Sequence, residues 1–331
     1  MSAQPSLDVV GIGNALVDVL SHEDEDFVAR HGLAKGTMTL IETERAEQLY
    51  AAMRTGVEMS GGSAGNTCAG VAGFGGAAAY MGRVFDDQLG AIFAHDMRSQ
   101  GVVYRTKPAT DGPPTGRSLI VITADGQRTM NTYLGASAFF GPEDVDADLV
   151  GAAKVTFLEG YLFDRPEPKE AYWLASRLAT EAGRKVALTL SDLFCVERHR
   201  DDFLPLVRER VDILFANEAE ACALWGCDEV GAAVERARAE VAVACITMGA
   251  KGSVVVAGPE THEIGIVPTD VVDTTGAGDL YAAGVLYGYT AGLPLPECGR
   301  LGALAASEVI GHTGARPEVD LGRLAAATRP A

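Results

Sequence analysis

The residues best suited to chemistry lie in one glycine-rich segment in the last third of the chain. It reads Asp273-Thr-Thr-Gly-Ala-Gly-Asp279 and leads into residues 280–289, whose apolar side chains recur at helical spacing. Glycines just ahead of a helix leave its first N–H groups unpaired, and those donors and the helix dipole attract anionic oxygen. Asp279 would stand beside this anion site as an ionised base. Such a pair suits phosphoryl transfer to a hydroxyl, unless Asp279 is merely a helix cap.

Two more segments bring polar groups that could bind an acceptor. Gly61-Gly-Ser-Ala-Gly-Asn66 would expose backbone and an amide ahead of a small-residue helix predicted over 67–74, and Asn14 and Asp18 follow the first predicted strand. A carboxylate accepts two neighbouring sugar hydroxyls, and an amide both donates and accepts. Helix capping explains either pair taken alone. Taken together with the glycine-rich segment at 273–279, these residues favour a site for sugar hydroxyls.

Two common nucleotide-binding motifs are missing. The sequence has no Gly-x-x-x-x-Gly-Lys-Ser/Thr segment, and the Gly-x-Gly-x-x-Gly pattern fails after the first strand, where residues 11–16 end in leucine. A near match over residues 73–78 falls inside a helix-like stretch rather than between a strand and a helix. An NAD-dependent oxidoreductase is therefore disfavoured.

The composition limits the partners. Of the 331 residues, 27 are basic and 45 acidic, a net charge of −18, which repels nucleic acids and anionic lipid surfaces. We therefore expect neither as a partner. The acidic run over residues 23–26 is interpreted as a solvated face rather than a metal site. The chain has six scattered cysteines and no Cys-x-x-Cys pair, which indicates reduced thiols.

No targeting segment is recognised in the sequence. Met1–Pro5 has no basic residues, and Leu7–Ile12 is interrupted by Asp8. Apolar runs end well before the roughly 18 residues that a membrane helix needs. We expect a cytoplasmic protein.

Short β-branched runs alternate with helical stretches along the second half of the chain. Strand, helix, strand in this order predicts right-handed crossovers and a doubly wound, mostly parallel α/β sheet with helices on both faces. The predicted strands are 155–158, 186–190, 211–216, 241–247 and 253–257, and the predicted helices are 168–181 and 218–225.

Two extended segments interrupt this alternation. Thr37–Glu42 and Ser118–Leu134 alternate with period two, and the second contains the turn Ala124-Asp-Gly-Gln127, which predicts a hairpin. Paired with each other they would form a small separate sheet. We expect this sheet to be a discontinuous β lid, from about 12–50 and 104–136, on a single α/β domain spanning 1–331.

These stretches together resemble the PfkB carbohydrate-kinase family, also called ribokinase-like, over nearly the whole chain. Residues 61–76 resemble its N-terminal signature, and 273–284 resemble its C-terminal Asp-Thr-x-Gly-Ala-Gly-Asp signature. The resemblance implies a ribokinase-like fold and transfer of the ATP γ-phosphate to a primary hydroxyl. It also implies that Asp279 is the general base. The positions that match the family's anion hole are Gly276, Ala277 and Gly278, and those that match its acceptor site are Asn14, Asp18, Gly62, Ser63 and Asn66.

The resemblance extends to the nucleotide side. Residues 217–220 match the family's Asn-x-x-Glu motif, in which the glutamate, here Glu220, organises magnesium and its waters. The residues that the resemblance places along ATP are Asn217, Thr247, Gly249 and Gly252. Asp273 and Thr275 match positions where some members bind a monovalent cation such as potassium, helped by loop carbonyls, here in 310–314.

Within the family, residues 13–18, 61–63 and 127–134 look most similar to adenosine kinases and their bacterial relatives. The strand period then directs three lid residues onto the acceptor, namely Met130, Thr132 and Leu134. Arg128 is expected either to approach the phosphates when the lid closes or to lie on the surface.

The resemblance leaves the acceptor open. Adenosine, giving AMP, is the first hypothesis, and Tyr161 and Phe163 are the candidates for an aromatic platform under a purine. The alternative acceptor is a sugar such as ribose, fructose or ketodeoxygluconate. A ligand-binding protein without catalytic activity is the remaining alternative. We expect the partners to be ATP and a small neutral nucleoside or sugar, and the protein to be a monomer or a homodimer joined at the lid edge.

Overall fold

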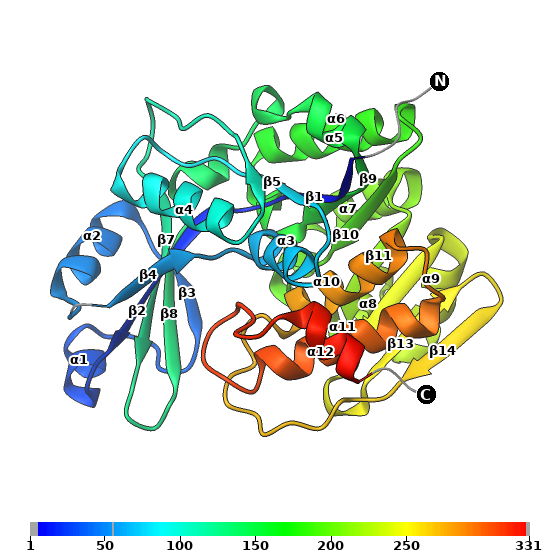
Figure 1. Ribbon diagram of the computed structural model, residues 1–331. Coiled ribbons are helices and arrows are strands. Elements are labelled where there is room, and N and C mark those ends of the chain that lie inside the picture. The colour runs from blue at the N-terminus through cyan, green and yellow to red at the C-terminus, as the bar shows by residue number, and fades with distance from the viewer. Residues whose placement is uncertain (1–5, 55, 329–331) are drawn as a thin grey trace.

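The computed structural model describes residues 6–54 and 56–328, so Met1–Pro5 lies outside the described part. Its larger sheet has nine strands in the order β14-β13-β12-β11-β10-β9-β1-β5-β6, parallel except at β12-β13 and β13-β14 (Figure 1). These strands are β1 (Leu7–Ile12), β5 (Ala78–Met81), β6 (Val103–Tyr104), β9 (Ala153–Glu159), β10 (Lys185–Thr189), β11 (Ile213–Asn217), β12 (Val243–Thr247), β13 (Ser253–Ala257) and β14 (Glu260–Ile264).

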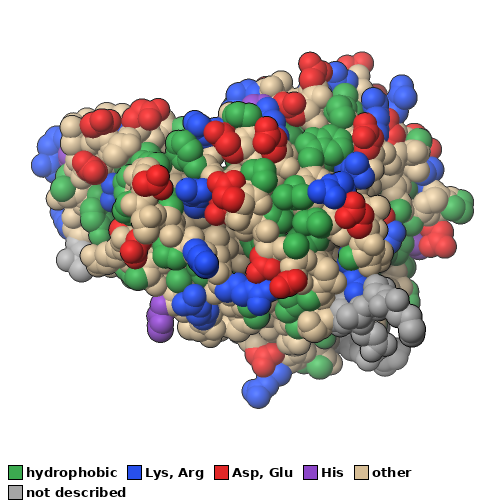
Figure 2. Space-filling view, turned by 90° about the horizontal axis from the view of Figure 1, so that it is seen from above, with side chains coloured by type: hydrophobic (Ala, Val, Ile, Leu, Met, Phe, Trp, Pro, Cys, Tyr) green, Lys and Arg blue, Asp and Glu red, His purple; other side chains and the backbone are tan. Residues whose placement is uncertain are grey.

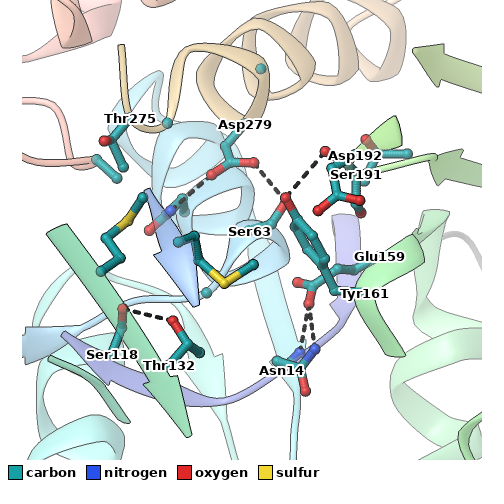
Figure 3. A pocket seen from close by; sticks show the side chains of 18 of the residues that line it. Asn14, Ser63, Ser118, Thr132, Glu159, Tyr161, Ser191, Asp192, Thr275 and Asp279 are labelled. Atoms are coloured by element: carbon teal, nitrogen blue, oxygen red, sulfur yellow. Dashed lines mark hydrogen bonds between the residues drawn. The ribbon is translucent and has the colours of Figure 1, made fainter. Parts of the chain in front are cut away.

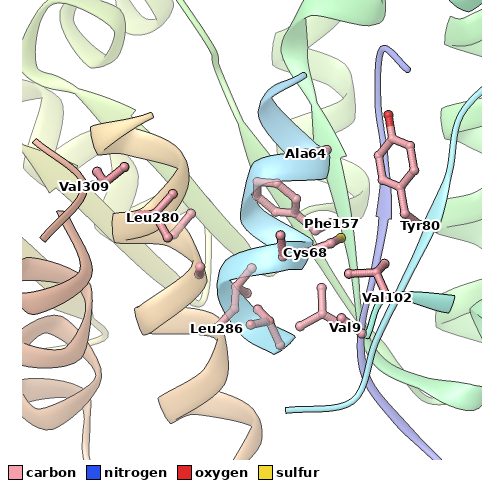
Figure 4. Close-up of a cluster of buried hydrophobic side chains, with 14 of the residues drawn as sticks. Val9, Ala64, Cys68, Tyr80, Val102, Phe157, Leu280, Leu286 and Val309 are labelled. Carbon is pink, nitrogen blue, oxygen red and sulfur yellow. The ribbon is translucent and has the colours of Figure 1, made fainter. Parts of the chain in front are cut away.

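Helices cover both faces of this sheet (Figure 1). Neighbouring strand residues point to opposite faces, so Phe157 and Leu158 belong to different hydrophobic cores. Figure 4 shows α3 packed between the sheet and α10, with Ala64 and Cys68 buried beside Phe157. The helices are α1 (Glu25–Arg30), α2 (Thr43–Ala52), α3 (Ser63–Gly73), α4 (Gln88–Ser99), α5 (Ala147–Ala152), α6 (Pro166–Glu181), α7 (Leu193–Arg210), α8 (Glu218–Trp225), α9 (Val230–Glu240), α10 (Ala277–Thr290), α11 (Leu295–Val309) and α12 (Leu321–Ala327).

A second sheet of five strands stands to one side of the first and forms the lid (Figure 1). Its order is β3-β8-β7-β2-β4, so it joins segments that lie far apart in the sequence. Hydrogen bonds between Thr123 and residues 126 and 127 close the predicted hairpin. The lid strands are β2 (Leu16–His22), β3 (Met38–Leu40), β4 (Val57–Ser60), β7 (Gly116–Ile122) and β8 (Arg128–Tyr133).

The predicted doubly wound α/β sheet with a discontinuous lid is confirmed, with two local differences. Helix α3 begins at Ser63 rather than at 67, so Ser63 and Asn66 belong to its first turn. The lid also includes β4, beyond the predicted bounds, because this short edge strand pairs antiparallel with β2. No helix within residues 6–54 and 56–328 is long and apolar enough to cross a membrane. On the face in Figure 2, acidic side chains are spread among basic and apolar ones rather than gathered in one patch.

Candidate active site

Polar residues stand at the carboxyl ends of five neighbouring strands of the large sheet. β1, β9, β10, β11 and β12 run parallel, so these ends meet at one edge, where open α/β sheets bind their ligands. A cavity of about 890 Å³ opens there. Residues from these strand ends that line it are Asn14, Glu159, Asp192, Asn217 and Thr247.

Asp279 lies in this cavity at the start of α10, facing the start of α3 (Figure 3). Its Oδ1 accepts a hydrogen bond from the Ser63 hydroxyl at 2.6 Å, and its Oδ2 accepts one from Asn66 Nδ2 at 2.8 Å. Gly276 is the N-cap residue of α10, and Asp279 is the third residue of the helix. The carboxylate therefore does not cap its own helix. Ser63 and Asn66, expected to contact the acceptor, line the cavity and both donate to Asp279.

The surroundings of Asp279 set its proton affinity. Burial raises the pKa of this carboxyl group, while hydrogen bonds from Ser63 and Asn66 and the charge of Arg316 act to lower it. Asn66 Oδ1 is buried and has no hydrogen-bond partner among the described residues. A hydroxyl beside Asp279 could therefore donate to either side chain.

The first turn of α10 presents unpaired N–H groups. Gly276 has φ +79°, and a Cβ there would lie 2.8 Å from Ala315 Cα, so this position requires glycine. Within the described residues, the N–H groups of Gly278 and Asp279 have no acceptor. These donors can stabilise an anionic oxygen. Residues 273–278 are named the anion-hole loop below.

Asp18 lies on β2, and its carboxylate reaches the cavity from the lid. No hydrogen-bond donor of the described residues contacts it. Burial raises its pKa to about 6, although the charges of Arg316 and Arg128 act in the opposite direction. Arg316 is itself fixed, because it donates to the carbonyls of Ser60 and Gly65. The Asp18 carboxylate therefore faces the cavity with lone pairs that can accept hydrogen bonds.

Glu159 is a site residue that the sequence analysis missed. It is 1% exposed and ends β9. Its Oε1 accepts from the N–H and Nδ2 of Asn14, both at 3.0 Å, and its Oε2 accepts from Ala64 N at 2.7 Å. Burial raises the pKa of Glu159 to about 7. The only sequence signal was a single acidic residue at the end of an apolar strand. Asn14 lines the cavity as expected, with one amide hydrogen bound to Glu159.

Gly62 sits between the lid and α3. It has φ +84°, and a Cβ there would lie 2.1 Å from the Asn14 carbonyl oxygen. Any larger residue would push the start of α3 away from β1, because the left-handed conformation and the close contact both exclude a side chain. Gly62 also lines the cavity.

Apolar side chains of the lid form one wall of the cavity. Met130, Thr132 and Leu134 line it as predicted, and Thr132 Oγ1 lies 3.1 Å from the Ser118 hydroxyl. Met38 and Leu40 on the neighbouring β3 also line it and were missed, because a three-residue strand has too little alternation to show its face. These two side chains are 44% and 48% exposed.

The two aromatic candidates differ. Tyr161 lines the cavity, and its hydroxyl donates to the Ser191 carbonyl at 3.2 Å. Phe163 is 2% exposed and stacks on Phe203 with ring centroids 4.2 Å apart. The prediction of Phe163 as a platform under a purine was wrong, because this ring belongs to the hydrophobic core. Phe194, which was not singled out, lines the cavity and is 69% exposed.

Asn217 and Glu220 form a reciprocal cap at the start of α8. Glu220 N donates to Asn217 Oδ1 at 2.9 Å, and Asn217 N donates to Glu220 Oε2 at 2.9 Å. Both residues line the cavity, and burial raises the pKa of Glu220 to about 7. Glu220 has no cation partner among residues 6–54 and 56–328, and such a buried carboxylate fits a divalent ion, because a nearby positive charge would stabilise its ionised form.

A second cavity of about 410 Å³ adjoins the first. Gly249 and Gly252 line it, and apolar side chains from the 265–271 loop and α11 form most of its walls. Both cavities are lined by the same residues at their junction, namely Thr247, Thr274, Ala277, Gly278 and Tyr281. Ligands in the two cavities would therefore meet at the start of α10.

Arg128 and Asp273 form a buried ion pair between the lid and the anion-hole loop. Their side chains are 8% and 10% exposed, and Arg128 Nη1 lies 2.8 Å from Asp273 Oδ2. Asp273 Oδ1 accepts from the N–H and hydroxyl of Thr275. The alternative that Arg128 is a surface residue was wrong, because its side chain forms a buried ion pair with Asp273.

Comparison with known proteins identifies the family. The model of the pfkB family of carbohydrate kinases matches residues 31–320. The chain belongs to this family. The crystal structure of an adenosine kinase from Sinorhizobium meliloti is 53% identical, covers 98% of this chain and 99% of its own, and superposes with a TM-score of 0.90. A probable sugar kinase from Rhizobium etli is 50% identical with the same coverage and a TM-score of 0.91.

An adenosine kinase from Dictyostelium discoideum is 29% identical over 335 residues, which cover 94% of this chain and 96% of that protein. This pfkB-family protein is therefore an ATP-dependent kinase. Kinases of this kind use ATP with a divalent metal ion. Relatives named as adenosine kinases and as sugar kinases both occur, so the family fixes phosphoryl transfer but not the acceptor.

Proposed function

We propose that this kinase phosphorylates the 5′-hydroxyl of adenosine to give AMP. The observation that carries the proposal is the division of the large cavity into a polar end and an apolar wall. Asp18, Asn14 and Asp279 line the polar end, and Met38 and Met130 contribute to the wall. A ribose fits the polar groups, and a flat apolar base fits the lid side chains. A free sugar would leave those lid side chains uncovered.

Methionine can replace the aromatic rings that this chain lacks. Met130 lies opposite Met38 in the β3–β8 ladder, and both side chains line the cavity. A flexible thioether packs well on an aromatic ring and contributes about 0.3–1.5 kcal/mol per contact. The partial exposure of Met38 and Leu40 is then explained, because a bound base would cover them.

The proposed reaction uses Asp279 as general base. Asp18 accepts the ribose hydroxyls, which directs the 5′-hydroxyl toward Asp279 and the unpaired Asn66 Oδ1. The hydroxyl oxygen forms a bond to the γ-phosphorus, its proton passes to Asp279, and the bond from that phosphorus to the β–γ bridging oxygen breaks, releasing ADP. The N–H groups at the start of α10 stabilise the charge on the transferring group.

ATP is proposed to occupy the second cavity, with its phosphates at the junction. The apolar walls suit the adenine, while Gly249 and Gly252 allow the backbone to approach the nucleotide. Glu220 would hold magnesium and its waters beside the phosphates, and Mg²⁺ would supply positive charge there. No group of three or more His, Cys, Asp or Glu among the described residues is arranged to hold a metal. The ion would therefore depend on the phosphate oxygens as further ligands.

A sugar kinase is the second candidate, supported by the polar end of the cavity, which would hold ribose alone. The R. etli relative is named a probable sugar kinase. Coupled ADP release from the purified protein with adenosine, inosine, ribose, fructose and 2-keto-3-deoxygluconate separates the two. We expect kcat/KM to be highest for adenosine. A higher kcat/KM for any of the sugars would refute the proposal.

A lid variant tests the apolar wall directly. Met130→Ala should raise KM for adenosine while leaving ribose turnover unchanged, because ribose does not reach the lid side chain. Val57→Ala is the matched control, since Val57 is 59% exposed on the edge strand β4 and does not line either cavity. An equal effect of Met130→Ala on both acceptors would contradict a base pocket at this wall.

A further inference from the structure

The Asp273 carboxylate is held by three hydrogen bonds and an ion pair. Oδ1 accepts from Thr275 N at 3.1 Å and from Thr275 Oγ1 at 2.8 Å. Oδ2 accepts from Gly314 N at 3.1 Å and forms an ion pair with Arg128 Nη1 at 2.8 Å. A carboxylate offers about four lone-pair sites. Three hydrogen bonds from the protein and the ion pair with Arg128 therefore surround this carboxylate.

The carbonyl of Ile310, at the start of the 310–314 loop, is also engaged. The Ile310 carbonyl accepts from Val272 N at 2.8 Å and from Asp273 N at 3.3 Å. A hard monovalent cation needs several oxygen atoms that can turn their lone pairs toward it. The lone pairs of Asp273 and of the Ile310 carbonyl face N–H and O–H donors and the Arg128 guanidinium, so these oxygen atoms do not fit a potassium ion.

Arg128 already supplies the positive charge at this place. Its guanidinium is paired with Asp273 under the lid, and the side chain is 8% exposed. A second cation beside it would be repelled strongly, because charges in a buried setting are poorly screened. Arg128 and a potassium ion are thus mutually exclusive partners of Asp273.

We infer that Arg128 takes the place of a monovalent cation beside the anion-hole loop, so that turnover by this kinase is independent of potassium. Arg128 is a positioning residue in this arrangement. Its charge neutralises Asp273 and holds the turn before Gly276, and the first N–H groups of α10 follow that turn. Because Arg128 belongs to lid strand β8 and Asp273 to the core, the loop gains this partner only when the lid lies over it.

The lid offers a matched control arginine. Arg117 lies on β7, the strand that pairs with β8, and is 8% exposed. Its guanidinium carbon lies 5.2 Å from the Tyr50 ring centroid, so it packs within the lid and not on the anion-hole loop. Arg117→Met therefore removes a buried lid arginine without touching Asp273.

The inference rests on the kinase activity and is tested at constant ionic strength in potassium, sodium and tetramethylammonium chloride. We expect the wild-type protein and Arg117→Met to turn over equally in all three salts. Arg128→Met should lose about ten- to a hundredfold in turnover in tetramethylammonium, because the anion-hole loop is misplaced, and potassium should restore part of it. Arg128→Lys, which keeps the charge, should stay independent of potassium.

Thermal unfolding gives a readout that needs no acceptor, so it still tests the inference if adenosine proves not to be the substrate. Potassium should raise the Tm of Arg128→Met relative to tetramethylammonium and leave the wild-type Tm unchanged. Activation or thermal stabilisation of the wild-type protein by potassium would overturn the inference. An Arg128→Met variant with wild-type turnover, or one impaired equally in every salt, would also overturn it.

Discussion

The Ser63 hydroxyl lies 2.6 Å from Asp279 Oδ1, which joins two helix starts that are 216 residues apart in the sequence. Ser63 opens α3 and Asp279 belongs to the first turn of α10. With Asn66 on the other carboxylate oxygen, the Asp279 side chain is held from both sides. The two glycine-rich segments are therefore joined, so that α3 fixes the carboxylate that we propose as the base beside the N–H groups of α10.

Removing the Asp18 carboxylate should abolish acceptor binding and spare the nucleotide. We expect Asp18→Ala to raise KM for adenosine by about 10²-fold or more, because each hydrogen bond to a charged group contributes about 1.5–3 kcal/mol. The Kd for ATP, measured by calorimetry without acceptor, should stay unchanged. Asp26→Ala, at an exposed position in lid helix α1, is the control. A loss of ATP affinity alone would contradict a sugar site at Asp18.

If Glu220 holds magnesium as proposed, replacing it should change the magnesium requirement of the kinase. Glu220→Gln should raise the magnesium concentration for half-maximal turnover about ten- to a hundredfold, because the carboxylate that orders the ion and its waters has lost its charge. Removing the metal with EDTA should abolish turnover of the wild-type protein. Titrating magnesium at saturating adenosine measures both effects. An unchanged magnesium dependence would show that Glu220 only caps α8.

Burial of Glu159 makes stability depend on pH. Its pKa rises from 4.5 to about 7 on folding. A carboxyl group with a raised folded pKa stabilises the protein below its unfolded pKa, and this contribution is lost as the pH rises through about 7. The free energy of unfolding should therefore fall between pH 5 and 8, by no more than about 3 kcal/mol from this group.

Chemical denaturation at several pH values tests this expectation. In Glu159→Gln the free energy of unfolding should fall less between pH 5 and 8, since the variant side chain cannot ionise. Glu44→Gln, on the exposed face of α2, should show the same fall as the wild-type protein. If the free energy of unfolding changed equally with pH in the wild-type protein and in Glu159→Gln, a role for Glu159 in the pH dependence would be contradicted.

Local sequence patterns were enough to predict most strands of the large sheet, but not β5, β6 and β14 and not all of the site. The helix Glu218–Trp225 and the strand Ser253–Ala257 were predicted to the residue, because Gly226 ends the first and β-branched residues fill the second. Phe163 and Tyr161 could not be told apart, since which ring turns into the core depends on contacts with α6 and α7.

Side-chain contacts between segments that lie far apart in the sequence could not be predicted either. Glu159 stands alone in the sequence, and its partner Asn14 is 145 residues away. The Arg128 and Asp273 side chains meet only because the lid folds over the anion-hole loop. Such contacts depend on tertiary structure, which hydrophobic periodicity does not report.

The most direct test is the turnover of Asp279→Asn with adenosine and ATP, measured beside the Kd for adenosine. Asparagine keeps the size of the side chain but is not a base. We expect kcat to fall by about 10²–10⁴-fold, as is typical when a general base is lost, while the Kd for adenosine stays close to that of the wild-type protein. Turnover near the wild-type rate would contradict proton transfer from the acceptor hydroxyl to Asp279.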